Sequence, residues 1–471
     1  MATAKDRLSD LDGCHKYLQR AFAVTNSTAL LVKALQSVQF QTLDSADFMT
    51  GADLSAGSQG QELMQGIKQA FSEAGYTKSA ILQATKAESM FELYYEKNYD
   101  ELDYEMILQS GQVNANLAYL IRMFLLHRVL PLSAMSKLFG PPALKLLLTL
   151  QVISVVNVSG VQLLSPSEAL EAVQGGPDGY RSLHCFSNVA MWPIEDDLVI
   201  ATDYVSAASV DGLDPVMYIA ADSYALASGA PRDPPVARLL DVCSGSGIQG
   251  IVGLRYYAET CTFVDLNPRA IRFTTFNVAL NGFANRSLGV YQGSVFEALP
   301  GSVQPFDAIL SNPPFIPNPG GVSTLASAMF GDGGATGEDV MESLVAGAHR
   351  MLAPGGRLST ISVAPNVEEM PERVEKWFSS KLSEPASCKA RIFTGQPESR
   401  EAWSADSRSS LVERVRLAQA LKSMGIRTLS RVIMVLQVGG SHMNVSLAGE
   451  PREKLWLDHE FLREAVRSAL L

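Results

Sequence analysis

Two spacings of apolar positions alternate along the chain from about residue 215 to its end. Short runs rich in Val, Ile and Leu have the length of buried strands, and between them apolar residues recur at helical spacing. The expected strands are 238–240, 261–267, 287–296, 305–312, 390–395 and 430–440, and the expected helices are 248–258, 268–282 and 409–424. Residues 337–364 add a long helix, a Pro-Gly-Gly turn and a further strand. This alternation predicts a parallel, doubly wound α/β sheet that binds ligands at the carboxyl ends of its strands.

The first half of the chain follows a different pattern. Residues 1–95 are predicted to be helical, because Leu30, Leu31, Ala34 and Leu35 follow helical spacing, and the polar stretch that begins at Gly51 interrupts them. Residues 96–175 are expected to form a winged-helix-like module and residues 176–214 a set of connecting strands. Residues 215–471 then form the α/β domain.

The order of elements in the segment 96–175 is that of a winged helix. A helix, a short helix and a third helix precede two β-branched runs that the hairpin signal Ser159-Gly160 joins. The third helix offers only Lys145 and Thr149 among its leucines, which indicates that it is buried. A structural or protein-docking role is therefore favoured over sequence-specific DNA binding.

Composition and charge exclude several classes of protein. The 471 residues carry a formal net charge of −11, which repels a phosphate backbone unless basic residues cluster, as they do between Arg400 and Arg431 with acidic residues interleaved. Five cysteines without a CxxC pair and six scattered histidines indicate neither a disulfide framework nor a metal site. No apolar run is long enough to cross a bilayer, and the first residues lack a secretory signal, so an intracellular, cytoplasmic protein is expected.

A glycine-rich turn follows the first strand of the α/β region. Gly245, Gly247 and Gly250 satisfy GxGxxG, and a helix begins directly after them, so that free backbone N–H groups face a bound ligand. Asp265 ends the next strand, where a carboxylate can accept both hydroxyls of a ribose. Dinucleotide sites and S-adenosylmethionine sites share this layout.

The motif Ser-Asn-Pro-Pro-Phe, residues 311–315, ends the fourth strand. Proline has no N–H and a fixed φ, so two in succession stop the strand and make a stiff segment. Asn312 precedes a proline and is itself held extended. The motif is either a simple turn or a rigid functional loop.

Three features together resemble one family. Asp241 within D-x-C-S-G-S-G resembles motif I of class I S-adenosylmethionine-dependent methyltransferases, LAPGG at 352–356 resembles the turn before their fifth strand, and SNPPF resembles the (N/D)PP(Y/F) of their amino-group methyltransferases. The combination is similar to the HemK-type and related small-domain enzymes, over about residues 215–365. Those enzymes act on the glutamine amide of release factors, on the 2-amino group of guanine in ribosomal RNA or on the 6-amino group of adenine.

The resemblance implies a Rossmann-like methyltransferase sheet, S-adenosylmethionine as cofactor and a macromolecular substrate, protein or RNA. The implied cofactor-binding residues are Asp241, Cys243, Gly245, Gly247, Asp265, Leu266, Ser294 and Asn312, and the implied catalytic residues are Asn312, Pro313, Pro314 and Phe315. The Asn312 side-chain oxygen and the Pro313 carbonyl would each accept one N–H of the acceptor nitrogen, and Phe315 would stack on its planar group. Cys243 replaces the first glycine of motif I, and Gly293-Ser294 replaces an acidic residue that faces the adenine.

Two other interpretations remain open. A methyltransferase fold that binds its cofactor or a partner without turnover is the main alternative, and a nicotinamide dehydrogenase ranks third because no Tyr-x-x-x-Lys or His-Asp pair is apparent. Residues 317–337, rich in Gly, Ser and Pro, are either a mobile lid over the substrate or a disordered insertion.

Overall fold

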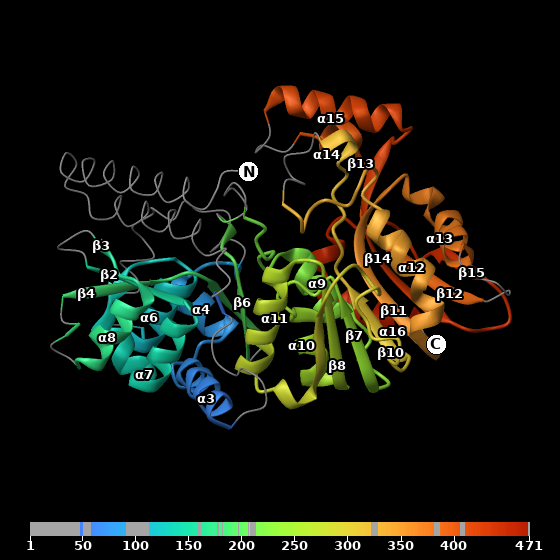
Figure 1. Cartoon of the computed structure of the whole chain (residues 1–471). Helices are drawn as coiled ribbons and strands as arrows, with labels where there is room; N and C mark the ends of the chain where they lie inside the picture. Colours follow the sequence, from blue (N-terminus) through green and yellow to red (C-terminus); the bar gives the residue numbers. More distant parts are fainter. Residues whose placement is uncertain are drawn as a thin grey trace. The chain divides into compact units, whose positions relative to one another are not determined.

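The computed structural model of the chain (Figure 1) has two compact units. Unit 1 comprises residues 1–213 with 279–282, and unit 2 comprises residues 214–278 with 283–471. The structure describes residues 48–49, 58–90, 113–157, 162–176, 179–180, 182–195, 197–205, 207, 213–321, 328–380, 387–405 and 410–469. The helices expected within residues 1–47 lie outside these described residues.

Unit 1 combines helices with a small antiparallel sheet. Its helices are α3 (Ser58–Glu73), α4 (Lys78–Thr85), α6 (Ala115–Phe124), α7 (Leu132–Thr149) and α8 (Pro166–Gln174). Its strands are β1 (Leu130–Pro131), β2 (Ile153–Asn157), β3 (Gln162–Leu163) and β4 (Leu183–Ser187), in the order β1-β4-β2-β3. A separate antiparallel pair joins β5 (Ala190–Ile194) to β6 (Leu198–Thr202).

Helix α7 contains both of the later helices expected in the segment 96–175. They meet at a kink where Gly140 has a φ of 74° and Pro141 and Pro142 follow, because neither proline can donate an intrahelical hydrogen bond. Beyond the kink the leucines at 144, 146, 147 and 148 are buried, Lys145 is half-buried and Thr149 is exposed. Strands β2 and β3 pair antiparallel as expected, and the predicted turn Ser159-Gly160 lies outside the described residues.

Unit 2 is built on a mixed, doubly wound sheet. Its strands are β7 (Val236–Val242), β8 (Ala258–Asp265), β9 (Ser287–Gln292), β10 (Phe306–Ser311), β11 (Leu352–Pro365), β12 (Cys388–Thr394), β13 (Glu398–Ser399), β14 (Thr428–Val438) and β15 (Asn444–Leu447). The order is β15-β12-β14-β11-β10-β7-β8-β9, and β13 pairs with β14. The five strands from β11 to β9 are parallel, which confirms that part of the prediction.

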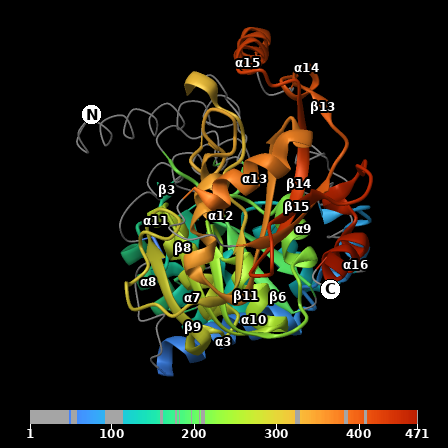
Figure 2. The same ribbon diagram turned by 90° about the vertical axis from the view of Figure 1, so that its right-hand side faces the viewer.

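The expectation of an all-parallel sheet is wrong at β14. This strand is antiparallel to both of its neighbours, β11 and β12. Parallel neighbours need a crossover over a face of the sheet, whereas antiparallel neighbours need only a return at the same end. The segment between β12 and β14 holds α14 (Arg400–Trp403) and α15 (Leu411–Ser423), which extend beyond the end of β14 instead of crossing the sheet (Figure 2).

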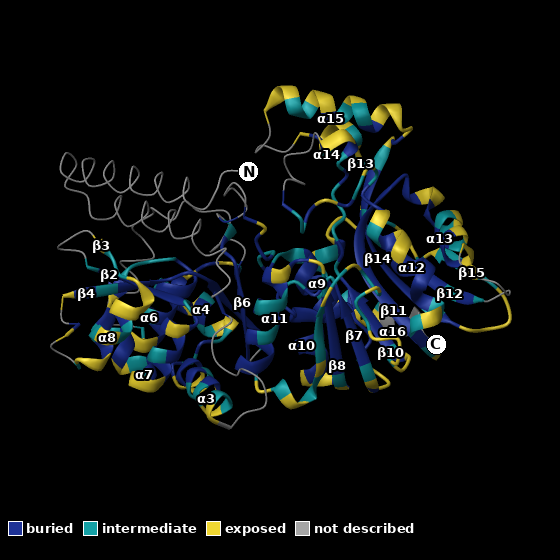
Figure 3. Ribbon diagram, viewed as in Figure 1, coloured by how far each residue is buried: buried dark blue, intermediate teal, exposed yellow. Residues whose placement is uncertain are grey.

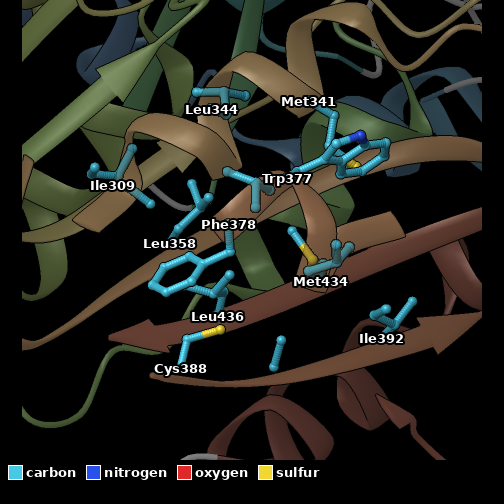
Figure 4. Packing of buried hydrophobic residues seen from close by; sticks show 14 of the residues in the cluster. Ile309, Met341, Leu344, Leu358, Trp377, Phe378, Cys388, Ile392, Met434 and Leu436 are labelled. Atoms are coloured by element: carbon cyan, nitrogen blue, oxygen red, sulfur yellow. The ribbon is translucent and has the colours of Figure 1, made fainter. Parts of the chain in front are cut away.

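Helices cover both faces of this sheet. One apolar cluster packs α12 (Asp339–Met351) and α13 (Met370–Ser379) onto the strands through Leu344, Phe378, Leu358, Met434 and Leu436 (Figure 4). On β14 the alternate residues Ile433 and Val435 belong to a second cluster, with α9 (Ala221–Gly229) and α16 (His459–Ala469). The central strands are therefore buried on both sides, as Figure 3 shows.

Glycine allows α10 (Ile248–Tyr256) to lie close to the sheet. A Cβ on Gly250 would lie 2.3 Å from Cε1 of Phe263, and a Cβ on Gly253 would lie 2.3 Å from Cδ2 of Leu239. The third glycine of GxGxxG thus serves helix packing. In the described part of the chain, no helix is both long enough and apolar enough to span a membrane.

Replacing Gly250 with alanine is expected to destabilise unit 2 by about 1–3 kcal/mol, the usual cost of overpacking a filled core. Equilibrium unfolding in urea measures the change. Gly301→Ala is the matched control, because a Cβ there meets no atom within 4 Å. Equal stability of the two variants would contradict the packing role of Gly250.

Candidate active site

A cavity of about 500 Å³ opens in unit 2 at the carboxyl ends of the parallel strands. Its wall brings together seven of the residues predicted from the sequence: Cys243, Gly245, Asp265, Leu266, Ser294, Asn312 and Pro314. The other four, Asp241, Gly247, Pro313 and Phe315, lie outside the cavity wall. No group of three or more His, Cys, Asp or Glu side chains is placed to hold a metal ion among the residues described.

The turn after β7 has the left-handed backbone that its sequence predicts. Gly245 has a φ of 54° and Gly247, the N-cap of α10, a φ of 79°. Cys243, which stands where motif I has glycine, also has a positive φ of 57°, a conformation that is uncommon for a side-chain-bearing residue. Burial raises the pKa of its thiol, so the side chain stays neutral.

Helix α11 (Pro268–Leu280) holds this turn from behind. The hydroxyl of Thr274 donates to the Gly245 carbonyl at 3.1 Å, and Asn277 Nδ2 donates to the Ser246 carbonyl at 2.8 Å. Both side chains are fully buried. Because α11 packs beside the sheet, its two hydrogen bonds to the turn prevent the turn from moving independently of the rest of unit 2.

Asp265 is one of the acidic residues of the cavity wall, together with Asp214 and Asp332. Its Oδ2 accepts the Gly245 N–H at 2.8 Å and its Oδ1 accepts the Asn267 N–H at 2.8 Å. Burial raises the pKa of this carboxyl, and the backbone N–H groups oppose the rise. Each carboxylate oxygen has more than one lone pair, so both can also accept a hydroxyl from a ligand in the cavity.

Asp241 has a structural position. It is fully buried, and its Oδ2 accepts the Gly250 N–H at 2.8 Å, which ties the end of β7 to the first turn of α10. Burial raises the pKa of this carboxyl well above its usual value, and the nearby Asp265 adds to the rise. Through this hydrogen bond the side chain stabilises the glycine-rich turn between β7 and α10.

The amide of Asn312 is held by a residue that the sequence motifs did not identify. Its Nδ2 donates to Asp222 Oδ2 at 3.0 Å, and Asp222, in the first turn of α9, is only 3% exposed. Burial raises the pKa of Asp222, and the hydrogen bond from Asn312 opposes the rise. The other end of the amide, Oδ1, is shielded from solvent and has no hydrogen-bond partner in the described structure.

Phe315 lies elsewhere than the sequence suggests. Its ring meets Trp456 edge-on, with 5.6 Å between centroids, beside the apolar cluster of Val363, Leu417 and Leu429. The backbone turns after the two prolines, and the ring follows it into this cluster. The sequence predicts that this ring stacks on a ligand in the cavity, whereas in the structure it packs against Trp456.

The structure describes part of the segment 317–337, for which the sequence leaves open a mobile lid or a disordered insertion. Residues 322–327 lie outside the described residues, whereas 328–337 are hydrogen-bonded to the chain that follows SNPPF. The N–H of Ile316 donates to the Gly331 carbonyl at 2.9 Å, and the N–H of Gly333 donates to the Ile316 carbonyl at 3.0 Å. Ala328, Met329, Phe330 and Asp332 thereby join the cavity wall.

Sequence reasoning missed Asp222, Val295 and Phe330. Asp222 lies in a segment with no motif, although an acidic residue in the first turn of a helix is itself a common signal. Val295 lines the cavity with a φ of 48°, which is unusual for a β-branched residue and which sequence does not reveal. Phe330 lies in a stretch whose composition suggests a loop.

Comparisons with known proteins agree with this geometry. The family model described as methyltransferase small domain matches residues 223–383. The release factor glutamine methyltransferase of Gloeobacter violaceus is 32% identical over 130 residues, which cover 26% of this chain and 44% of that protein. The enzyme of the same name from Deinococcus radiodurans is 34% identical over 129 residues, again 26% of this chain and 44% of that protein.

A ribosomal protein L11 methyltransferase from Prochlorococcus marinus is 32% identical over 80 residues, 17% of this chain and 26% of that protein. The chain thus spans less than half the length of each of these three relatives. All three matches are to methyltransferases, in agreement with the strand order, the glycine-rich turn and the position of Asn312. The match of residues 223–383 to the methyltransferase small domain model and the similarity to two release factor glutamine methyltransferases support a class I S-adenosylmethionine-dependent methyltransferase of the HemK-like group.

Proposed function

We propose that this protein transfers a methyl group from S-adenosylmethionine to a planar amino or amide nitrogen of a macromolecule, either a protein glutamine amide or an RNA base. The observation that carries the proposal is the Oδ1 of Asn312, a buried acceptor without a partner in the described structure. A buried polar atom is costly unless something satisfies it. An N–H of a substrate bound in the cavity supplies that partner.

The residues of the cavity fit the cofactor. Asp265 keeps free lone pairs on both carboxylate oxygens for the two ribose hydroxyls, and Leu266 beside it offers an exposed apolar surface for a base. Ser294 supplies a hydroxyl at the position where related enzymes carry an acidic residue. Gly245 lets the chain approach the ligand without a side chain between them.

The chain's own residues prepare the acceptor nitrogen. When bound, the cofactor would supply an electrophilic methyl group and would keep the electron pair of the broken carbon–sulfur bond, while the nitrogen lone pair would form the new bond. A planar nitrogen delocalises that lone pair. Asn312 Oδ1 and the Pro313 carbonyl would accept its two N–H groups, draw it toward tetrahedral geometry and stabilise the positive charge that develops. The proton is then lost to solvent, so no strong base is needed.

The rigidity of this arrangement has two sources. The prolines restrict the backbone on one side of Asn312, and Asp222 holds the side-chain amide on the other. Pre-set dipoles cost no reorganisation when charge develops. Asp222 therefore acts as a positioning residue.

The names of the relatives support a macromolecular acceptor. Their names refer to release factors and to ribosomal protein L11, and the net charge of −11 on this chain favours a protein over RNA. Residues 1–95 and the winged-helix-like module at 96–175 would position that substrate, and the buried leucines of α7 do not suit sequence-specific DNA binding. The alternative, a fold that binds the cofactor without turnover, predicts cofactor binding with no transfer.

Asn312→Ala is expected to reduce methyl transfer by about 100-fold or more, the scale of losing a pre-set oxyanion-type group. Tritium transfer from labelled S-adenosylmethionine into an extract that lacks the endogenous protein measures it, with protease and nuclease separating the products. Asn444→Ala is the control, since this asparagine is exposed on the edge strand β15. Undiminished transfer by Asn312→Ala would refute the proposed role.

Asp222→Ala is expected to lower the rate of transfer by about tenfold, with the affinity for S-adenosylhomocysteine retained, because the Asn312 amide loses its anchor. Asp222→Asn keeps an acceptor oxygen for Asn312 Nδ2 and should recover part of the rate. Calorimetry measures the affinity for S-adenosylhomocysteine, and the transfer assay measures the rate of methyl transfer. Equal rates for the two variants would show that burial at this position matters and the hydrogen bond does not.

Asp265→Ala is expected to weaken binding of S-adenosylhomocysteine by about 10- to 100-fold, because hydrogen bonds to a charged group contribute about 1.5–3 kcal/mol each. Isothermal titration calorimetry measures it without any methyl acceptor. Asp307→Ala removes a carboxylate outside the cavity wall as the comparison. Tighter binding of NADH than of S-adenosylhomocysteine by the unaltered protein would favour the dehydrogenase interpretation.

A further inference from the structure

We propose that Phe330, rather than Phe315, is the aromatic residue that holds the planar acceptor group in the cavity. This inference rests on the proposed function and assigns one specificity-determining residue within it. Both phenylalanines belong to unit 2, and the chain from one to the other folds back on itself through backbone hydrogen bonds.

The ring of Phe315 is engaged on the other side of the motif. It meets Trp456 with an interplanar angle of 60° and packs beside the apolar cluster that includes Leu417 and Leu421 of α15. To reach the cavity the ring would have to leave these contacts and expose apolar surface to water. Its packing therefore supports α15 and the turn after the two prolines.

The segment 328–337 lies directly on the backbone of Phe315. A Cβ on Gly333 would lie 2.8 Å from the Cα of Phe315, and a Cβ on Gly337, whose φ is +88°, would lie 2.5 Å from the Phe315 carbonyl oxygen. Only glycine permits two backbones to approach this closely. The glycines of this stretch thus bring the segment into contact with the motif.

Hydrogen bonds set the register of the same contact. Ile316 pairs with Gly331 and Gly333, and the N–H of Asn318 donates to the Gly334 carbonyl at 2.8 Å. The side chain of Asp332 adds two more bonds, since its Oδ2 accepts from Asn318 Nδ2 at 2.9 Å and its Oδ1 accepts the Gly334 N–H at 3.0 Å. The segment is held four residues beyond Asn312, so the position of Phe330 relative to the Asn312 amide is set by the fold.

Phe330 faces the cavity from this segment. Phe330 lines the wall together with Met329 and Met217, and its ring meets Tyr218 edge-on with 6.1 Å between centroids and an interplanar angle of 78°. Edge-to-face packing fixes the plane of a ring. Asn312, Pro314 and Phe330 thereby contribute an amide acceptor, a rigid apolar surface and an aromatic ring to one cavity.

The chemistry needs both parts. Asn312 Oδ1 and the Pro313 carbonyl would accept hydrogen bonds from the nitrogen that is methylated, but they leave the plane of its group free to tilt. An aromatic ring beside that group limits the tilt and excludes water. A planar amide and a nucleobase both offer a π face to such a ring. An aliphatic side chain of similar size at position 330 would fill the space without fixing the plane.

The test compares four variants of the 471-residue chain: Phe330→Ala, Phe330→Leu, Phe330→Tyr and, as a matched control, Phe283→Ala, whose half-buried ring lies outside the cavity wall. Calorimetry with S-adenosylhomocysteine and thermal unfolding show that cofactor binding and folding are intact. Tritium transfer into the extract, at several dilutions of the extract, separates the rate at saturation from the apparent affinity for the acceptor. Asn312→Ala is run beside them.

The proposal predicts that Phe330→Ala and Phe330→Leu each reduce methyl transfer at low extract concentration by about tenfold or more. Phe330→Tyr and Phe283→Ala should then transfer as the unaltered protein does, and the affinity for S-adenosylhomocysteine should stay within about twofold throughout. Transfer retained by Phe330→Leu while Asn312→Ala is inactive overturns the role of Phe330 and leaves the proposed function standing. Transfer retained by Asn312→Ala, or absent from the unaltered protein with cofactor bound, removes the proposed function and this inference with it.

Discussion

Five parallel strands of unit 2 end at the same edge of one sheet, and every part of the candidate site depends on that constraint. Register pairs Leu310 of β10 with Asp241 of β7, and Asp241 with Phe263 of β8, so the residues that follow these strands emerge side by side. Asp265 and Asn312 are distant in the sequence but adjoin one cavity for this reason. Helices on both faces keep the strands buried, so the edge can shift only if the core repacks.

Some polar groups at that edge stabilise the loops, and others are placed to contact a ligand. The carboxylate of Asp241 binds the backbone of α10, and that of Asp265 binds the glycine-rich turn while it still lines the cavity. Asn312 has its nitrogen engaged by Asp222 and its oxygen free. The two carboxylates shape the loops, and the amide oxygen of Asn312 is, like Gln249 Oε1, a buried acceptor of a wall residue without a partner in the described fold.

The glycines of unit 2 show which structural roles local sequence can predict and which it cannot. Gly245 and Gly247 adopt the left-handed backbone expected of a ligand-binding turn. Gly250, in the same motif, is needed for packing of α10 against Phe263, and Gly333 and Gly337 are needed where two loop segments touch near Phe315. The sequence predicted permissive backbone at Gly245, Gly247 and Gly250 of the motif, and it made no such prediction for Gly333 and Gly337. Which neighbour requires it is a property of contacts between segments far apart in the sequence.

The sequence by itself determined the strand and helix alternation of unit 2, the turn after β7 and the break after β10, because apolar period, glycine and proline act over a few residues. It also placed Asp265 and Asn312 at strand ends, which was enough to predict a shared site. Only the tertiary structure decided the reversed direction of β14, the partnership of Asp222 with Asn312 and the sides on which Phe315 and Phe330 lie. Each of these depends on which distant surfaces meet, and that is settled by burial of whole helices and strands rather than by the preference of any single residue.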